Sequence, residues 1–310
     1  TGGDGGAIYN GNNNGGYSNL VVLNSRFKNN SARRGACLLG GLDFNTLAID
    51  RCIFTANSSE LSIIEIDGFA SATISNSYMI GNAVDDSFAN VFRVQTSAAT
   101  EVLTLTNCTF VQNFNLYANP GSETIRVYGT HHRIENSIVY GNTAHNGSQV
   151  SSGMNIFSSI VQGGHPNGSG IMDTDPVFNS PSSSTGASFD ATVFDYTLAA
   201  ISPAINAGSN DHVPTTSTLD LVGAPRIQGG TVDMGCYESG LTTSIAKQEY
   251  TDAPWYFDPV NHVIHIATGY TNSASNVLIH DMNGRLVCRA GITSNGGPVQ
   301  LPAGAYLATW

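Results

Sequence analysis

Short runs of alternating apolar and polar residues recur along the first half of the chain. Five segments share one pattern: an apolar residue, two variable residues, a small Ser or Cys, one residue, a large apolar residue, two residues and Asn. They end at Asn30, Asn57, Asn82, Asn113 and Asn142, and a sixth, weaker copy starts at Phe157. Alternation with a period of two is typical of β-strands, and a near-constant repeat with insertions indicates a solenoid of stacked coils.

The repeat predicts three columns of residues along the solenoid axis. Its small residues, spaced 22 to 31 residues apart, are Ser25, Cys52, Ser77, Cys108, Ser137 and Ser159. Two apolar columns are expected to point inward: Ile49, Ile74, Leu105, Ile134 and Ile156 before the small residue, and Phe27, Phe54, Met79, Phe110, Val139 and Val161 after it. The final Asn of each unit suits a tight bend in a left-handed conformation. At a coil spacing of roughly 4.8 Å its amide can also bond the Asn of the next coil.

A second set of strands follows each repeat, and each strand carries one charged residue between two apolar ones. These strands are Ile64–Ile66, Phe92–Val94 and Ile125–Val127, with Gly5–Ile8 and Gly35–Leu38 at the corresponding place in the first coils. We therefore predict an all-β fold in which residues 1–170 form a right-handed parallel β-helix.

The repeat resembles known families. The GGAI segment at Gly5 and the Phe-x-x-Asn segments at Phe27, Phe54 and Phe110 are similar to the GGA[ILV] and FxxN repeats of polymorphic outer-membrane proteins. They also resemble the broad pectate-lyase-like superfamily. The resemblance implies the β-helix fold and says little about function. The sequence opens inside a Gly-rich repeat, so we expect further coils to precede it.

Residues 171–240 depart from the repeat. They contain Asp175-Pro-Val-Phe, Ser202-Pro-Ala-Ile-Asn-Ala-Gly and Asp233-Met-Gly-Cys-Tyr-Glu, in an order that resembles the closing region of secreted bacterial β-helix proteins. Because the last coil of a solenoid exposes strand edges, we assign this region to a cap. A buried Arg–carboxylate pair is expected among its charged residues Asp220, Arg226, Asp233 and Glu238. The alternative is a calcium site built from Asp173, Asp175, Asp220 or Asp233.

A polar linker at 241–252 leads to short alternating segments over residues 253–310, which predict a small Ig-like β-sandwich. The run VLIHDMNGRLV followed by LPAGAYL resembles the C-terminal sorting domain of type IX secretion substrates in Bacteroidota. The matching motif residues are Asn283, Gly284, Arg285, Leu301, Pro302, Gly304 and Tyr306. Such domains usually continue with another strand, which we expect to be absent from this sequence.

The resemblance implies export to the outer-membrane surface of a Gram-negative bacterium. The type IX secretion machinery would then be a partner of residues 253–310. The alternative for this segment is an Ig-like module with no sorting role.

Composition narrows the function classes. Only 11% of the residues are charged, against about 25% in an average domain, which excludes a helical bundle or a coiled coil. The net charge of −11 argues against nucleic acid as a partner, since phosphates attract Lys and Arg. No apolar run is long enough for a membrane span. Cys52 and Cys108 lie two coils apart, too far for a disulfide, and no zinc motif is present.

The best candidate for a binding site is a row of charged residues on the second set of strands. Glu65, Arg93 and Arg126 are expected to point outward from neighbouring coils. They would bind an acidic sugar, because Arg makes forked hydrogen bonds to carboxylates. The alternative is a solvated charge ladder. No catalytic residue, metal site or cofactor is assigned, apart from the calcium alternative.

Three functions fit these observations. The first is a non-enzymatic secreted surface protein, an adhesin or glycan-binding passenger exported by the type IX route. The second is a polysaccharide lyase or glycoside hydrolase whose active face lies in preceding coils or in loops 83–90 and 114–122. The third is a cargo held by a secretion partner through its C-terminal domain.

Overall fold

A computed structural model describes most of the chain up to residue 240 and six strands beyond that point. The described residues are 3–10, 18–40, 44–95, 102–117, 122–144, 148–188 and 190–240, together with the backbone of the six strands between residues 255 and 309. The chain divides into two units, Thr1–Thr243 and Ser244–Trp310, and each is described by itself.

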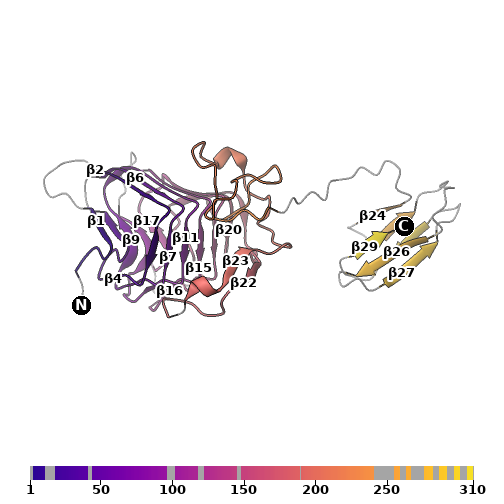
Figure 1. The fold of residues 1–310 in the computed structure, drawn as a ribbon, viewed down its shortest axis with the longest axis horizontal. Coiled ribbons are helices and arrows are strands. Elements are labelled where there is room, and N and C mark those ends of the chain that lie inside the picture. Colours follow the sequence, from indigo (N-terminus) through magenta and orange to yellow (C-terminus); the bar gives the residue numbers. More distant parts are fainter. Residues whose placement is uncertain are drawn as a thin grey trace. The chain divides into compact units, whose positions relative to one another are not determined.

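The first unit contains a parallel β-solenoid, as predicted, in which strands of successive coils lie side by side (Figure 1). A five-stranded sheet is formed by β1 (Ile8–Asn10), β5 (Leu38–Gly40), β9 (Ser62–Ile66), β13 (Asn90–Val94) and β17 (Ile125–Val127). A four-stranded sheet is formed by β4 (Ser31–Ala32), β8 (Ser58–Ser59), β12 (Ala83–Val84) and β16 (Phe114–Asn115). All neighbours in both sheets pair in parallel.

A twelve-stranded sheet completes the coils and has two arms. The first arm is β2 (Ser18–Leu23), β6 (Phe44–Asp50), β10 (Phe69–Ser75), β14 (Val102–Thr106) and β18 (His132–Glu135). The second arm is β3 (Arg26–Lys28), β7 (Ile53–Thr55), β11 (Tyr78–Ile80), β15 (Thr109–Val111) and β19 (Ile138–Tyr140). The arms join at β20 (Met154–Val161), which pairs with β18 and β19 and carries β21 (Gly168–Met172) on its other side.

The inward apolar columns are confirmed by the strand register. Ile49, Ile74, Leu105, Ile134 and Ile156 are direct partners from coil to coil. So are Phe27, Phe54, Met79, Phe110, Val139 and Val161. These residues belong to one continuous core, and the Phe27 and Phe54 rings stack with their centroids 4.8 Å apart. Burial of like side chains on every coil supplies the main stabilisation of this unit.

The small residues also form one column, because their side chains complete the turn between the two arms. The Ser77 hydroxyl accepts the amide of Cys52 at 3.1 Å, and the Ser137 hydroxyl accepts the amide of Cys108 at 3.0 Å. Each Ser hydroxyl in turn donates to the carbonyl two residues earlier. Cys52 and Cys108 are free, fully buried thiols separated by the coil of Ser77.

The asparagines that end the repeats form the predicted ladder. The side-chain oxygen of Asn82 accepts both the backbone amide and the side-chain amide of Asn57, at 3.1 and 2.9 Å. Asn113 does the same for Asn82, and Asn142 for Asn113. The side-chain amides of Asn57, Asn82, Asn113 and Asn142 also donate to a backbone carbonyl of the preceding coil, such as Phe54 O for Asn82. Asn57, Asn82 and Asn113 therefore bond to the coils on both sides of their own.

The left-handed conformation, however, was predicted one residue too late. The residue before the ladder asparagine has the positive φ, as in Asn29, Ala56 and Gln112, whereas the ladder asparagines do not. A second left-handed position precedes each small residue, as in Asn24, Asn76, Asn107 and Asn136. The chain reverses at the residue before the ladder, which leaves the next side chain free to enter the coil and bond its neighbours.

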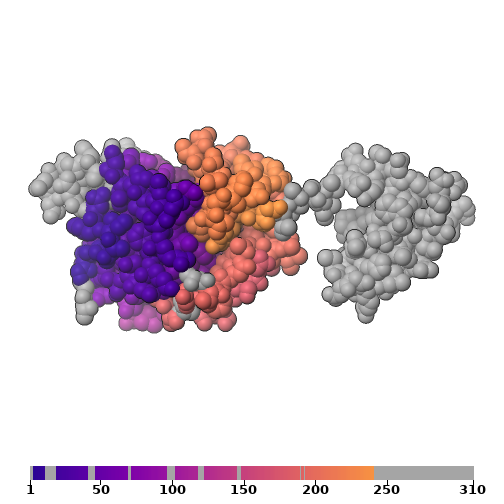
Figure 2. Space-filling view, in the orientation of Figure 1, coloured from indigo at the N-terminus to yellow at the C-terminus, as the bar shows by residue number. Residues whose placement is uncertain are grey.

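Residues 173–240, the cover segment, pack along the side of the solenoid (Figure 2). The segment contains the hairpin of β22 (Phe178–Ser180) and β23 (Asp195–Leu198) and two short 3-10 helices, η2 (Ala191–Val193) and η3 (Asn210–His212). It buries the outward side chains of the second arm, among them Tyr78, Ile80, Val111, Ile138 and Ile160. Its contacts extend back to the first coil, where Lys28 pairs with Asp190 at 2.9 Å. The region was expected at the end of the last coil, and the structure places it against the flank of several coils.

The second unit consists of two antiparallel sheets. One contains β24 (Trp255–Asp258), β25 (Val263–Ile266) and β28 (Gly297–Gln300), and the other contains β27 (Leu286–Gly291), β26 (Asn276–Asp281) and β29 (Tyr306–Thr309). These strands lie where the alternating segments of the sequence predicted them. Within the described part of the chain, no helix has the length and hydropathy needed to cross a membrane.

We expect Asn82→Ala to destabilise the solenoid by about 2–4 kcal/mol, because it removes the buried acceptor of both Asn57 amides and one of the two donors to the Asn113 side chain. Asn30→Ala at the end of the ladder is the matched control. Asn30 donates to Asn57 but accepts no amide from another ladder asparagine, so its loss should cost about 1 kcal/mol. Urea denaturation of the whole chain, followed by far-ultraviolet circular dichroism, measures both. An equal loss of unfolding free energy in both variants would contradict a larger contribution from the asparagines inside the ladder than from the one at its end.

Candidate functional site

The strand register places the three predicted charged residues in one row. In the strand register, Glu65 of β9 is aligned with Arg93 of β13, and Arg93 is aligned with Arg126 of β17. The row lies on the outer face of the five-stranded sheet. On β5, the strand that pairs with β9 on the side away from β13, the residue aligned with Glu65 is Leu39. The predicted stacking on neighbouring coils is thus present.

Glu65 differs from the expectation of a solvated charge, because its side chain is fully buried. Arg34 donates to one of its oxygens at 2.5 Å, and the side-chain amide of Gln95 donates to the same oxygen. Ser62 donates to the other oxygen at 2.5 Å. Burial alone would raise the pKa of Glu65, but the hydrogen bonds from Arg34, Ser62 and Gln95 outweigh it and lower the pKa. Glu65 is an ionised anchor for these side chains and is closed to a ligand.

The two arginines of the row bond to neighbours other than Glu65. Arg93 donates to the carbonyl of Phe88 at 3.2 Å. Arg126 pairs with Glu123 at 2.9 Å, and its guanidinium lies 5.1 Å from the ring centre of Tyr128. The row therefore does not converge on a free space, and its arginines position the loops beside it.

A groove of about 310 Å³ lies on the neighbouring four-stranded sheet. Its floor consists of the first residue of each short strand, Ser31, Ser58 and Ala83, which are direct partners. Its side is a row of exposed charged residues at the position three after each ladder asparagine, namely Arg33, Glu60 and Asp85. Arg33 pairs with Asp4 at 2.8 Å. Hydroxyl groups and two carboxylates on neighbouring coils thus border one open groove.

Exposed apolar side chains gather at one end of this groove. Leu116 continues the row after Asp85, since its amide bonds to the carbonyl of Val84. Leu116, the adjacent Tyr117 and Phe88 are 55, 54 and 64% exposed. The amide of Phe88 bonds to Asp86, and its carbonyl accepts the hydrogen bond from Arg93. The loop is therefore held in place while its ring stays in solvent.

The repeat pattern did not predict the groove, although two of its loops were candidates. Loops 83–90 and 114–122 were expected to carry an active face, and the described parts of both carry these exposed side chains. The signal for the rest was the fixed offset from the ladder: counting three residues from Asn30, Asn57 and Asn82 finds Arg33, Glu60 and Asp85. Arg34 and Gln95, which reach Glu65 from neighbouring coils, have no such signal, because they occupy no repeated position in the pattern.

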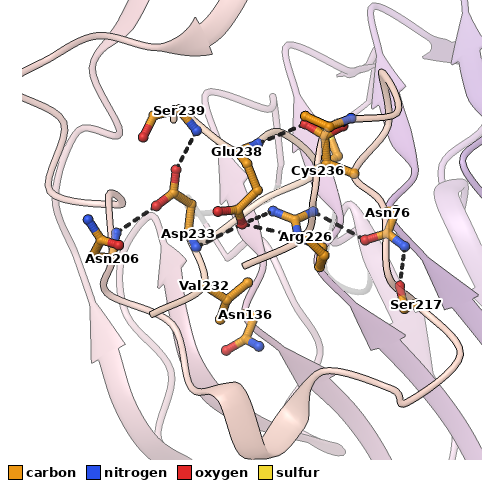
Figure 3. Close-up of polar contacts among 12 residues, drawn as sticks. Asn76, Asn136, Asn206, Ser217, Arg226, Val232, Asp233, Cys236, Glu238 and Ser239 are labelled. Atoms are coloured by element: carbon orange, nitrogen blue, oxygen red, sulfur yellow. Dashed lines mark hydrogen bonds and ion pairs between the residues drawn. The ribbon is translucent and has the colours of Figure 1, made fainter. Parts of the chain in front are cut away.

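The four residues assigned to a cap come together in one buried network, of which Figure 3 labels Arg226, Asp233 and Glu238. Arg226 is 1% exposed; it donates to Glu238 through two nitrogens and to the side-chain oxygen of Asn76 at 3.1 Å. Asp233 accepts the amides of Asn206 and Ser239, both at 2.7 Å. Asp220 accepts the amide of Glu238 at 3.0 Å.

Because Asn76 is in the third coil, this network fastens the cover segment to the flank of the solenoid. Burial raises the pKa of Glu238 to about 7, against the lowering by Arg226. Removal of Arg226 would leave its three acidic neighbours without their buried cation, which is strongly destabilising.

The calcium alternative finds no cluster among the described residues. Asp173 accepts the amide of Gly163, and Asp175 accepts that of Val177, while Asp220 and Asp233 belong to the network of Arg226. No group of three or more His, Cys, Asp or Glu in the described part of the chain is arranged to hold a metal ion. The proposed sorting motif lies outside the described residues from Asn283 to Arg285 and from Leu301 to Gly304, and Tyr306 begins β29.

No protein-family model matches the chain, and no curated protein matches it. The features that bear on its chemistry are the groove, the exposed rings and the buried charged groups described above.

We expect Glu65→Gln to destabilise the solenoid by about 2 kcal/mol at pH 7, because the charge-assisted bonds to Arg34, Ser62 and Gln95 weaken. The folded-state pKa of Glu65 is lowered, so its contribution is present above the unfolded pKa near 4.5 and is lost as the pH falls through the folded value. The difference between variant and wild type should therefore shrink below about pH 4.5.

Glu60→Gln, an exposed carboxylate in the groove, is the control and should change stability by less than about 0.5 kcal/mol. Urea titrations at several pH values test both variants. A cost for Glu65→Gln that does not depend on pH would contradict the ionised anchor.

Proposed function

We propose that this protein is a glycan-binding passenger of a bacterial cell surface, exported by the type IX secretion route. The observation that carries the binding role is the groove of the four-stranded sheet with exposed rings at its end. In this proposal the solenoid winds to the right, as crossovers between parallel strands nearly always do. The C-terminal sheets form an Ig-like sandwich that acts as the secretion signal.

The groove suits an extended polymer of sugars. It runs across successive coils, so equivalent side chains recur roughly every 4.8 Å along it. Ser31 and Ser58 offer hydroxyls, and Glu60 and Asp85 offer carboxylates that accept hydrogen bonds from sugar hydroxyls. Because Arg33 is already paired with Asp4, the groove favours a neutral or amino-bearing glycan over an acidic one.

The exposed side chains at the end of the groove supply the apolar part of such a site. Phe88 on the third coil and Leu116 and Tyr117 on the fourth follow the strands of the four-stranded sheet, and each is more than half exposed. Contiguous exposed apolar groups bordered by polar ones are typical of binding surfaces. An aromatic ring can pack against the apolar face of a sugar while the acids of the groove bond its hydroxyls.

The arrangement favours binding over catalysis. Glu65, the carboxylate of the charged row, is buried, and Arg34, Ser62 and Gln95 all donate to it. Glycoside hydrolysis is the second candidate, because Glu60 and Asp85 occupy equivalent positions on neighbouring coils. The spacing between neighbouring coils is close to the roughly 5 Å between the two carboxyl groups of retaining enzymes. An adhesin that uses the same face to bind a host or neighbouring cell would need the same groove.

Export is supported by the C-terminal unit. Its residues resemble a type IX sorting domain, and its strands form two antiparallel sheets of three, the number expected for a small sandwich. The division of the chain near residue 243 would let this unit serve as a separate signal. A secretion partner that holds the chain as cargo would use the same unit.

We expect a glycan array to detect binding of a neutral or amino-bearing glycan. Phe88→Ala and Tyr117→Ala should each weaken that binding about three- to tenfold, since each removes one stacking ring. Tyr9→Ala is the control, because Tyr9 is 58% exposed on the five-stranded sheet outside the groove. Calorimetry measures the affinities. Equal losses in all three variants would argue against the groove, and turnover abolished by Glu60→Gln and Asp85→Asn would favour the hydrolase.

We expect export to depend on residues 244–310. In a host with type IX machinery, the whole chain behind a general secretion leader should reach the cell surface, and a chain ending at residue 243 should stay in the periplasm. A periplasmic reporter fused to residues 244–310 should also reach the surface. Surface labelling measures all three. The sorting role would be refuted if the chain ending at residue 243 reached the surface, or if the whole chain and the reporter fusion both stayed in the periplasm. Either result would leave the glycan test unaffected.

A further inference from the structure

A small pocket lies between the cover segment and the second arm of the twelve-stranded sheet, separate from the groove. It encloses about 110 Å³ and is lined by side chains of the first three coils and of the cover segment. The residues that matter for its chemistry are Arg26, Thr55, Tyr78, Phe194, Tyr196 and Tyr237. A single ring with its substituents is the size of ligand that such a space accepts.

The walls of the pocket are aromatic and held in fixed positions. Tyr78 packs edge to face against both Tyr196 and Tyr237, with ring centres 5.9 and 5.8 Å apart. The Tyr196 hydroxyl is bonded to Gln112 and to the amide of Ser182, which fixes its ring as a wall. Rigid aromatic walls are a common feature of sites that hold flat ligands.

Two buried hydroxyl groups among the lining residues have no partner. Thr55 is fully buried and Tyr78 is 5% exposed, and neither hydroxyl makes a hydrogen bond. A buried hydroxyl without a partner is costly, so such groups usually bond to something in the native state. The amides of the ladder asparagines are bonded from coil to coil, whereas these two hydroxyls beside the pocket are left for a ligand to bond.

The pocket also has an unpaired positive charge. Arg26 is exposed on β3, and among the described arginines it is the one with neither an ion pair nor a hydrogen bond. Lys28, two residues further along the same strand, is already paired with Asp190. A guanidinium next to aromatic walls matches a carboxylate, to which it can make two parallel hydrogen bonds.

We propose that this pocket binds a monocarboxylate carried on a six-membered ring, with the carboxylate on Arg26 and the ring against Tyr196 and Tyr237. Two sources share this chemistry, a sugar acid such as a uronate and an aromatic acid such as benzoate. Because the ligand would touch both the coils and the cover segment, its binding would also stabilise their contact.

The test uses the whole chain with glucuronate, benzoate and glucose as probes. Calorimetry should detect one of the two carboxylates at millimolar concentration and no binding of glucose, which matches glucuronate without the charge. The carboxylate that binds identifies the source, and it should raise the melting temperature of the solenoid. Failure of both carboxylates to bind, or binding of glucose as tight as that of glucuronate, would overturn the proposal.

Three variants locate the site. Arg26→Gln should weaken carboxylate binding about tenfold or more, because it removes the forked bonds. Lys28→Gln, the matched cation on the same strand, should leave the affinity unchanged. Thr55→Val keeps the side-chain shape and removes an unpartnered hydroxyl, so it should fold normally and bind more weakly if that hydroxyl bonds the ligand. Unchanged binding in Arg26→Gln would overturn the assignment even if a carboxylate binds elsewhere.

Discussion

Each coil of this protein depends on the next coil to complete its hydrogen bonds. A single coil leaves its strand edges and turn amides without partners, and stacking satisfies both at once. The ladder from Asn30 to Asn142 and the column from Ser25 to Ser159 perform this task at the two turns, where backbone pairing alone does not reach. The side chains at these positions must therefore be alike on every coil, which accounts for the repeat in the sequence.

The same requirement leaves the outer faces free to differ. Inward positions must pack against equivalent positions above and below, whereas outward side chains meet solvent or a segment that covers them. The chain has few charges, and several of them are buried in contacts that hold separate segments together. Arg34 and Glu65 join two coils, and Arg226 and Glu238 secure the cover segment to the coil of Asn76. Buried ion pairs of this kind hold a particular arrangement in place, since breaking one leaves an uncompensated charge.

The proposed glycan site lies on a face that stays uncovered. The cover segment buries the second arm of the twelve-stranded sheet, and Glu65 occupies the middle of the five-stranded sheet with its own bonds. The four-stranded sheet keeps an open groove of small and charged residues with Phe88 and Tyr117 exposed at its end. A solenoid can present such a groove without any moving part, which is consistent with the proposed binding role.

The repeat was enough to predict the coils, their register and the ladder, because the residues in each column are chemically alike and recur at a regular spacing. The closing motifs also named Arg226, Asp220, Asp233 and Glu238 as one group. The place of that group, and the partners that Glu65 takes, became visible only in the folded chain. Arg226 meets Asn76 across 150 residues of sequence, and Arg34 and Gln95 reach Glu65 from the coils on either side of it. Contacts of the outward side chains depend on how the loops and the cover segment pack. The repeating pattern cannot predict that packing, because these segments are not part of the repeat.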